Sequence, residues 1–119
     1  MNSTEKSKEL QKRLINHTLA VVKTVGELKK TQANLIFSKQ IIRSASSMGS
    51  NYTEAIFSYS RPDFIHNVNI AKKEAGETVY WLELLAHENH EFSKEISLIK
   101  DETLELLKIF ISIVKTSQK

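Results

Sequence analysis

Four side chains that can bind a metal ion lie close together in the sequence: Glu83, His87, His90 and Glu91. Spacings of three and four residues would place them on one face of a helix. Di-iron helical bundles use a Glu-x-x-His motif on each of two helices, but His17 and His66 are isolated here and supply no second motif. Histidine is also favoured near a helix C-terminus. We therefore predict a solvated helix end, no metal ligand and no cofactor, and keep metal binding at this cluster as the alternative.

Nucleophilic and stacking chemistry receive little support. Serine is frequent, but no serine lies in a nucleophile-elbow motif, and none is spaced from a base as in a catalytic motif. No catalytic residue is assigned, and we do not expect an enzyme. Tyr80 and Trp81 could stack on bases, yet within the run YWLELL a packing role is favoured. The same interpretation applies to Phe37, Phe57 and Tyr59.

Basic side chains are concentrated at the start of the chain. Residues 1–30 contain seven Lys or Arg against three Asp or Glu, whereas residues 61–92 contain three against six. A basic surface attracts phosphate backbones. The candidate nucleic-acid contacts are Lys6, Lys8, Lys12, Arg13, Lys23, Lys29 and Lys30. Because no aromatic residue interleaves with them, such binding should be weak, salt-sensitive and indifferent to sequence; the alternative is an ordinary solubilising surface.

Helices must position these side chains. The chain has only three Gly and one Pro, and its apolar residues recur at spacings of three and four. Helices are predicted over residues 5–30, 32–59, 61–90 and 93–117, with Ser60 and Ser93 as the caps of the last two. Helices of about 25 residues, each about 37 Å long, suit an all-α, antiparallel up-down four-helix bundle. We expect one domain over residues 1–119.

The composition indicates the cellular compartment in which this domain is expected. The chain has no Cys, which excludes disulfides and thiolate metal sites. Its N-terminus lacks the apolar segment of a signal peptide, and no apolar run approaches the roughly 20 residues that span a bilayer. We expect a cytoplasmic protein that does not act in a membrane.

The corner at residues 60–61 predicts which polar side chains meet. If the second and third helices fold back there, residues equally far from the corner lie opposite one another. Arg43 then faces Glu77, with Glu74 one turn away, and an ion pair should fix the register more than it adds stability, because desolvation offsets the attraction. Asn51 would face Ile70, and Glu54 would face Asn67. The predicted structural polar network is Arg43, Asn51, Glu54, Glu74 and Glu77.

One flank of the second helix carries small residues. Ala45, Gly49 and Thr53 recur every four residues. Glycine in a helix interior costs about 1 kcal/mol relative to alanine, so a compensating interaction is expected. We predict that a neighbouring helix approaches closely along this flank.

Two helices carry a second apolar stripe. It comprises Ile15, Leu19 and Val22 in the first helix, and Leu107, Ile111 and Val114 in the last. A monomeric bundle needs only one apolar stripe on each helix. The second stripe is therefore either a wide core-facing surface or a homo-oligomer interface.

The stretch of residues 40–85 carries a family resemblance. It contains a basic residue, a run of small residues, an Asn shortly after a Gly, and a Glu: Arg43, Ser47, Gly49, Asn51 and Glu54. The runs SRPDFI and KEAGETVYWLELL follow. This pattern resembles the bacterial four-helix-bundle protein family first noticed as reading frames inside intervening sequences of large-subunit ribosomal RNA genes. Gly76 departs from the pattern, since a bulkier helix former is usual there, and would mark another close approach.

The resemblance implies a four-helix bundle and a ring-like homopentamer, but no activity. We expect a non-enzymatic, oligomeric scaffold or adaptor that presents a surface to an unidentified protein partner. The alternative is an accessory protein that binds RNA or DNA weakly, without sequence preference, through its basic first helix. The biological role and the exact oligomer number do not follow from the sequence.

Overall fold

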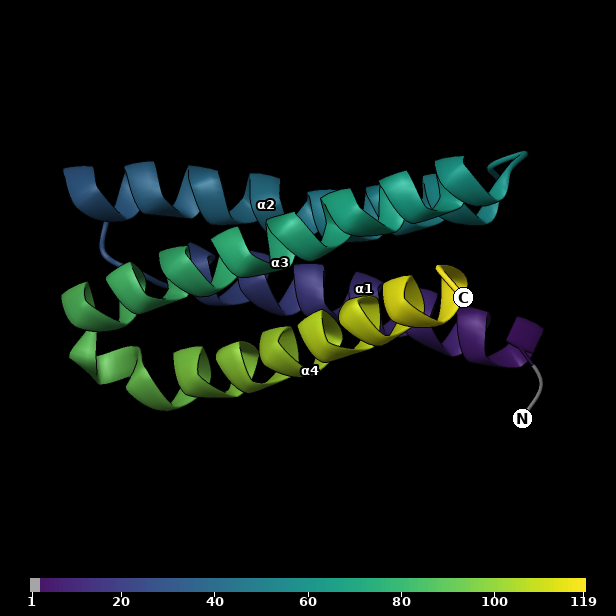
Figure 1. Cartoon of the computed structure of the whole chain (residues 1–119). Coiled ribbons are helices and arrows are strands. Elements are labelled where there is room, and N and C mark those ends of the chain that lie inside the picture. The colour runs from purple at the N-terminus through teal and green to yellow at the C-terminus, as the bar shows by residue number, and fades with distance from the viewer. Residues whose placement is uncertain (1–2) are drawn as a thin grey trace.

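The computed structural model describes residues 3–119, which form four long α-helices and contain no β-strand. The helices are α1 (Ser3–Gly26), α2 (Gln32–Ile56), α3 (Arg61–Glu88) and α4 (Ser93–Ser117), with a short 3₁₀ helix η1 (His90–Phe92) before α4. Successive helices run in opposite directions along a molecule of 45 × 25 × 19 Å (Figure 1). The predicted all-α class and the four helices are confirmed; residues 1 and 2 of the expected domain lie outside the described residues.

The joints show which capping predictions hold. The hydroxyl of Ser60 accepts a hydrogen bond from the backbone N–H of Asp63 at 3.2 Å, as the sequence predicts. Thr31 caps α2 in the same way, through the N–H of Asn34 at 3.1 Å. The prediction for Ser93 is wrong, because Ser93 is the first helical residue and no side chain caps α4. The preceding 3₁₀ turn replaces that cap.

Three helices end earlier than the periodicity predicts, α3 by two residues at Glu88. Glycine is the usual residue at a helix C-terminus, and α1 stops at Gly26, after which the chain tightens into 3₁₀-type bonds to the carbonyls of Thr24 and Val25. Lys29 and Lys30 therefore lie in the connection to α2. The second helix stops at Ile56, which leaves residues 57–60 as an open corner.

The apolar core fills the space between all four helices. Fully buried members from each helix are Leu14, Met48, Leu82 and Phe110. Val114 belongs to this core and Leu107 packs half-buried against the same cluster, which fits the core-facing alternative for these two residues. Ile15, Leu19, Val22 and Ile111 stay exposed.

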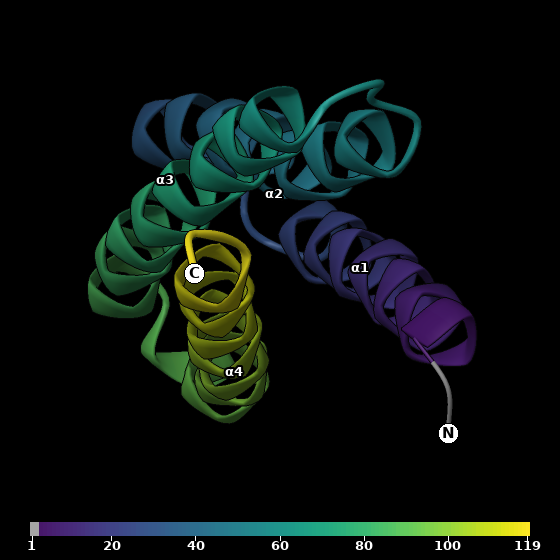
Figure 2. The ribbon, with the colours of Figure 1, turned by 45° about the vertical axis from the view of Figure 1, so that its right-hand side comes forward.

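The four helices do not pack equally closely. Among the α-helix pairs that touch, α2 and α3 have the most extensive contact and α1 and α4 the least, and the ribbons of α1 and α4 stand apart in Figure 2. Contacts join α1 to α2 and α4, and α3 to α2 and α4. The α1–α2 pair and the α3–α4 pair therefore form opposite sides of the bundle.

Two helical glycines differ from expectation. A Cβ on Gly49 would meet the Cβ of Leu14 at 3.6 Å, an ordinary van der Waals contact with α1. A Cβ on Gly76 would meet nothing within 4 Å. The approach of α1 to Gly49 exists but leaves room for alanine, and the expected close approach at Gly76 is absent.

Candidate functional site

A polar cluster joins α2 to α3 at the predicted place. Arg43 Nη1 lies 3.3 Å from Glu74 Oε2, and Arg43 Nη2 lies 3.4 Å from Glu77 Oε1. The Glu74 carboxylate is nearly buried, whereas Arg43 and Glu77 are partly exposed. Directly below, the hydroxyls of Ser44 and Thr78 are 2.8 Å apart and fully buried. These contacts between α2 and α3 fix the register of the two helices relative to each other.

Asn51 and Glu54 do not belong to that cluster, so the wider network predicted for them is wrong. The amide of Asn51 donates to the carbonyl and hydroxyl oxygens of Ser47, one turn earlier in the same helix, at 2.9 Å each. Glu54 is exposed and takes part in no hydrogen bond or ion pair within the described chain. A side chain bonded within its own helix cannot align a neighbouring helix.

Polar side chains also join α1 to α4. Arg13 makes a bidentate pair with Glu102, at 3.0 and 2.7 Å; this hydrogen bonding raises the pKa of Arg13 above its usual value, although burial opposes it. One turn on, His17 Nε2 lies 2.7 Å from the hydroxyl of Thr103 in the bundle interior. Burial lowers the pKa of His17 to about 4, opposed by the charge of Glu102. His17 is therefore neutral at physiological pH.

The candidate nucleic-acid contacts do not form one compact patch. Lys8, Lys12 and Lys23 are exposed and lie on the side of α1 opposite its buried residues. Lys6 is exposed near α4, and Lys29 and Lys30 are exposed after the helix. Arg13 is already paired with Glu102. The lysines are accessible to a phosphate backbone, while Arg13 is engaged within the bundle.

Exposed apolar side chains follow the boundary between α1 and α2. We call Ile15, Leu19 and Val22 the α1–α2 flank. Ile15 and Leu19 have fractional exposures of 61 % and 59 %. They line a groove of about 320 Å³ whose opposite wall contains Ser46, Gly49 and Ser50 of α2. The small residues of α2 thus leave space beside an apolar ridge.

A second apolar strip lies on the opposite side of the bundle. We call Leu104, Leu107 and Ile111 of α4 the α3–α4 flank. Their spacing places them on one face with Lys100, whose ammonium lies 3.4 Å from Glu83 of α3. Leu104 and Ile111 are exposed and Leu107 is half-buried.

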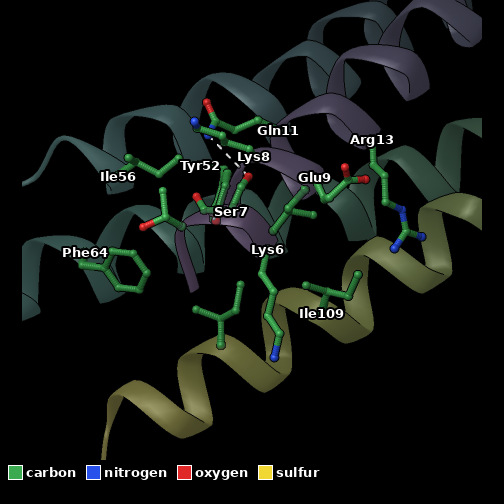
Figure 3. Close-up of a pocket in the computed structure, with 13 residues that line it drawn as sticks. Lys6, Ser7, Lys8, Glu9, Gln11, Arg13, Tyr52, Ile56, Phe64 and Ile109 are labelled. Atoms are coloured by element: carbon green, nitrogen blue, oxygen red, sulfur yellow. Dashed lines mark hydrogen bonds between the residues drawn. The ribbon is translucent and has the colours of Figure 1, made fainter. Parts of the chain in front are cut away.

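The largest groove, of about 780 Å³, lies between the first turns of α1 and the last turns of α4 (Figure 3). Its floor includes Leu10, Phe64 and Ile109, and within it the hydroxyls of Ser7 and Tyr52 are 2.9 Å apart. Among the described residues that line it there is no histidine. Charged side chains of Lys6, Lys8, Glu9 and Arg13 also line the groove, beside its apolar residues.

The four residues considered for metal binding do not converge. His87 and His90 have ring centroids 6.4 Å apart and are exposed, and His87 Nδ1 lies 3.4 Å from Glu88. The carboxylate of Glu83 instead forms an ion pair with Lys100. Within residues 3–119, no three His, Asp or Glu side chains are placed to hold a metal ion.

The aromatic residues divide into packed and exposed groups. Trp81 packs against Phe37 and Tyr80, with ring centroids 6.1 and 5.1 Å away, which confirms its packing role. Phe57 and Tyr59 are exposed in the corner between α2 and α3, so the packing interpretation is wrong for both. The sequence signal that could have predicted their exposure was the run of serines before Pro62, which marks a corner between two helices.

A buried amide pair closes the opposite end of the bundle and was missed from the sequence. Asn34 and Asn89 exchange two hydrogen bonds, at 2.9 and 2.8 Å. Asn34 also donates to the carbonyl of Lys29, and Asn89 to that of Leu85. The pair links the α1–α2 connection to the end of α3.

None of the helices in residues 3–119 is long and apolar enough to cross a bilayer.

Comparison with known proteins identifies a family and a closely similar solved structure. The profile of the 23S rRNA-intervening sequence protein family matches residues 5–112. A crystal structure at 1.70 Å of a protein of unknown function from Bacteroides thetaiotaomicron, assigned to the S23 ribosomal protein family, superimposes with a TM-score of 0.81 and 38 % sequence identity. The similarity covers 89 % of this chain and 98 % of the other. No curated protein matches the sequence.

Proposed function

The chain belongs to the 23S rRNA-intervening sequence protein family, and from that premise we propose that it acts in the cytoplasm as a non-enzymatic, oligomeric scaffold or adaptor. The observation that carries this proposal is the exposure of apolar side chains on two opposite sides of one bundle, the α1–α2 flank and the α3–α4 flank. Exposed apolar strips of this kind are usually covered by a partner.

The placement of the flanks favours a head-to-tail assembly. Because they lie on opposite sides, the α1–α2 flank of one copy would contact the α3–α4 flank of the next. Such a heterologous contact closes into a ring when the rotation between copies fits. We propose five copies, the number that the family resemblance implies, with a mass five times 13.6 kDa. The outer surface of the ring would then be free to bind a further protein.

Light scattering with three variants tests this assembly. Leu19→Glu disrupts the α1–α2 flank and Ile111→Glu the α3–α4 flank, so each should give a monomer. Mixed in equal amounts, the two should form heterodimers, because each variant retains the flank that the other has lost. Leu98→Glu is the control, since Leu98 is exposed on a different face of α4. An unchanged mass for both flank variants would contradict the proposal.

A second candidate function is weak RNA or DNA binding without sequence preference, and it is favoured by the exposed lysines of α1. Lys8, Lys12 and Lys23 point away from the core and are not used in any ion pair within the described residues. A ring would repeat them in every copy and multiply their attraction for phosphates. Glutamate at these three positions should abolish such binding. For single strands, the logarithm of the affinity should fall steeply with the logarithm of salt concentration, with a slope of about −0.7 for each phosphate neutralised.

A further inference from the structure

The corner between α2 and α3 exposes two aromatic rings that the fold does not use. Phe57 has a fractional exposure of 76 %, and Tyr59 is fully exposed at 102 %. They are separated by one residue in the four-residue segment 57–60, which connects α2 to α3. Neither ring makes an aromatic contact within the described chain.

The turn itself depends on two serines, Ser58 between these rings and Ser60 after them. The hydroxyl of Ser58 donates to the carbonyl of Ala55 at 2.6 Å, and the hydroxyl of Ser60 accepts from the N–H of Asp63. These bonds end α2 and begin α3. The aromatic side chains are therefore not needed to form the corner.

A concave surface with a guanidinium lies beside Tyr59. Tyr59, Ser60 and Arg61 line a hollow of about 350 Å³. Arg61 also lines a second hollow, of about 470 Å³, together with His66. The guanidinium donates to the backbone carbonyl of Lys119 at 3.3 Å, which brings the C-terminus to the corner. In Figure 1 the end of α4 lies at the same end of the molecule as this corner.

The charges around the rings are mixed but contain accessible cations. Arg61, Lys115 and Lys119 are exposed at this end, together with the carboxylates of Glu54 and Asp63. The electrostatic attraction for an anion is consequently modest. Any polyanion held here would depend mainly on contact with the rings.

We propose that this corner binds single-stranded nucleic acid, with bases stacked on Phe57 and Tyr59 and a phosphate beside Arg61. Exposed aromatic rings next to a guanidinium are the groups that unpaired bases use for stacking. A protein partner would instead require a contiguous apolar patch, whereas Ser60 and Arg61 lie beside Tyr59 in the hollow. A duplex keeps its bases stacked internally and cannot use the rings. The site lies within one copy, so it depends neither on the ring nor on the α1 lysines.

Fluorescence anisotropy of labelled 12-nucleotide poly(A) and poly(U) RNA, with a 12-base-pair RNA duplex for comparison, tests the proposal. Removing one stacking partner typically lowers affinity about 5- to 150-fold, so Tyr59→Ala and Phe57→Ala should each weaken single-strand binding by at least about fivefold. Tyr59→Phe should retain it. Tyr80→Ala is the matched control, because Tyr80 is also an exposed aromatic residue but lies on α3 away from the corner. Arg61→Gln should weaken binding and make its salt dependence shallower.

A second readout separates stacking from a loss of folding. In Tyr59→Trp the new indole should be quenched by poly(A), whereas the packed Trp81 of the unaltered protein should not respond. Equal binding of duplex and single strand, or unchanged affinity in Tyr59→Ala and Phe57→Ala, would overturn the proposal, as would no binding at all. Binding lost only in the α1 lysine variants would assign the interaction to α1 and also overturn it. The oligomer mass, measured on the same samples, reports on the scaffold independently.

Discussion

The imidazole of His17 and the hydroxyl of Thr103 form a buried hydrogen bond of 2.7 Å between the middle of α1 and the middle of α4. The hydroxyl of Thr103 also lies 2.7 Å from the carbonyl of Ile99, to which it donates. It can therefore only accept from His17, which fixes the proton of the neutral imidazole on Nε2. The other nitrogen, Nδ1, is then a buried acceptor without a partner in the described structure.

This arrangement predicts a loss of stability in mild acid. The pKa of His17 is lowered to about 4 by burial, while an exposed histidine titrates near 6.5. Between these values the unfolded chain binds more protons than the folded one, so stability rises with pH across this window and is lost as pH falls from about 6.5 to about 4. We expect a loss of about 2 to 3 kcal/mol at pH 4.5 relative to pH 8. Urea unfolding at both pH values measures it.

The control for that prediction is an exposed histidine. His66→Gln should show the same pH dependence as the unaltered protein, whereas His17→Gln should show a smaller one. An identical dependence in all three proteins would assign the acid sensitivity to other groups.

The unequal burial of Glu74 and Glu77 predicts unequal effects on stability. Arg43→Met leaves the nearly buried Glu74 carboxylate without its cation, and a buried charge without a partner is destabilising. Glu77→Gln removes only a partly exposed pair, typically worth about 0 to 1 kcal/mol. We expect Arg43→Met to cost about 2 kcal/mol or more, in urea unfolding at pH 7. Equal losses would show that the buried carboxylate does not depend on Arg43.

Gly76 offers a stabilising substitution. A Cβ there meets nothing within 4 Å, and alanine lowers the conformational entropy of the unfolded chain relative to glycine. Gly76→Ala should raise the free energy of unfolding by about 0.5 to 1 kcal/mol. Gly49→Ala is the comparison, because its Cβ would contact Leu14 at 3.6 Å and fill part of the groove of the α1–α2 flank. If only Gly49→Ala changes the oligomer mass, that groove contributes to assembly.

The Asn34–Asn89 pair predicts non-additive effects. Asn34→Leu leaves the amide of Asn89 buried without its side-chain partner, which should cost about 1 to 3 kcal/mol. The double substitution to leucine removes both amides and should lose less than the sum of the single effects. The double-mutant cycle, measured by urea unfolding, gives the coupling free energy. Additive losses would show that the two amides act separately.

Much of the fold could be predicted because helical periodicity is a local signal. The serine cap at residue 60 located the corner, and fold-back about it placed Arg43 near Glu74 and Glu77. The same geometry failed for Asn51, because its amide finds a partner one turn away in its own helix. The end of α1 was misplaced because Leu28 continues the apolar spacing but is buried from a 3₁₀-type turn.

The remaining polar contacts could not be predicted from spacing. His17 and Thr103 lie 86 residues apart, and Asn34 and Asn89 lie 55 apart. Each pair connects helix positions whose rotation about the helix axis is fixed only when the whole core packs. The exposure of Tyr59 likewise depends on where α2 ends, which periodicity located three residues too late.

The weak contact between α1 and α4 affects how the chain folds during its synthesis. Helix α1 is synthesised before α4, yet the side chains of Arg13 and His17 bond only to residues of α4. Helices α2 and α3 are adjacent in the chain and can associate as soon as both have emerged. The buried side of α1 that faces α4 consequently stays uncovered until α4 has been synthesised. A nascent chain stalled before α4 should therefore bind a chaperone through α1, and release it when synthesis resumes.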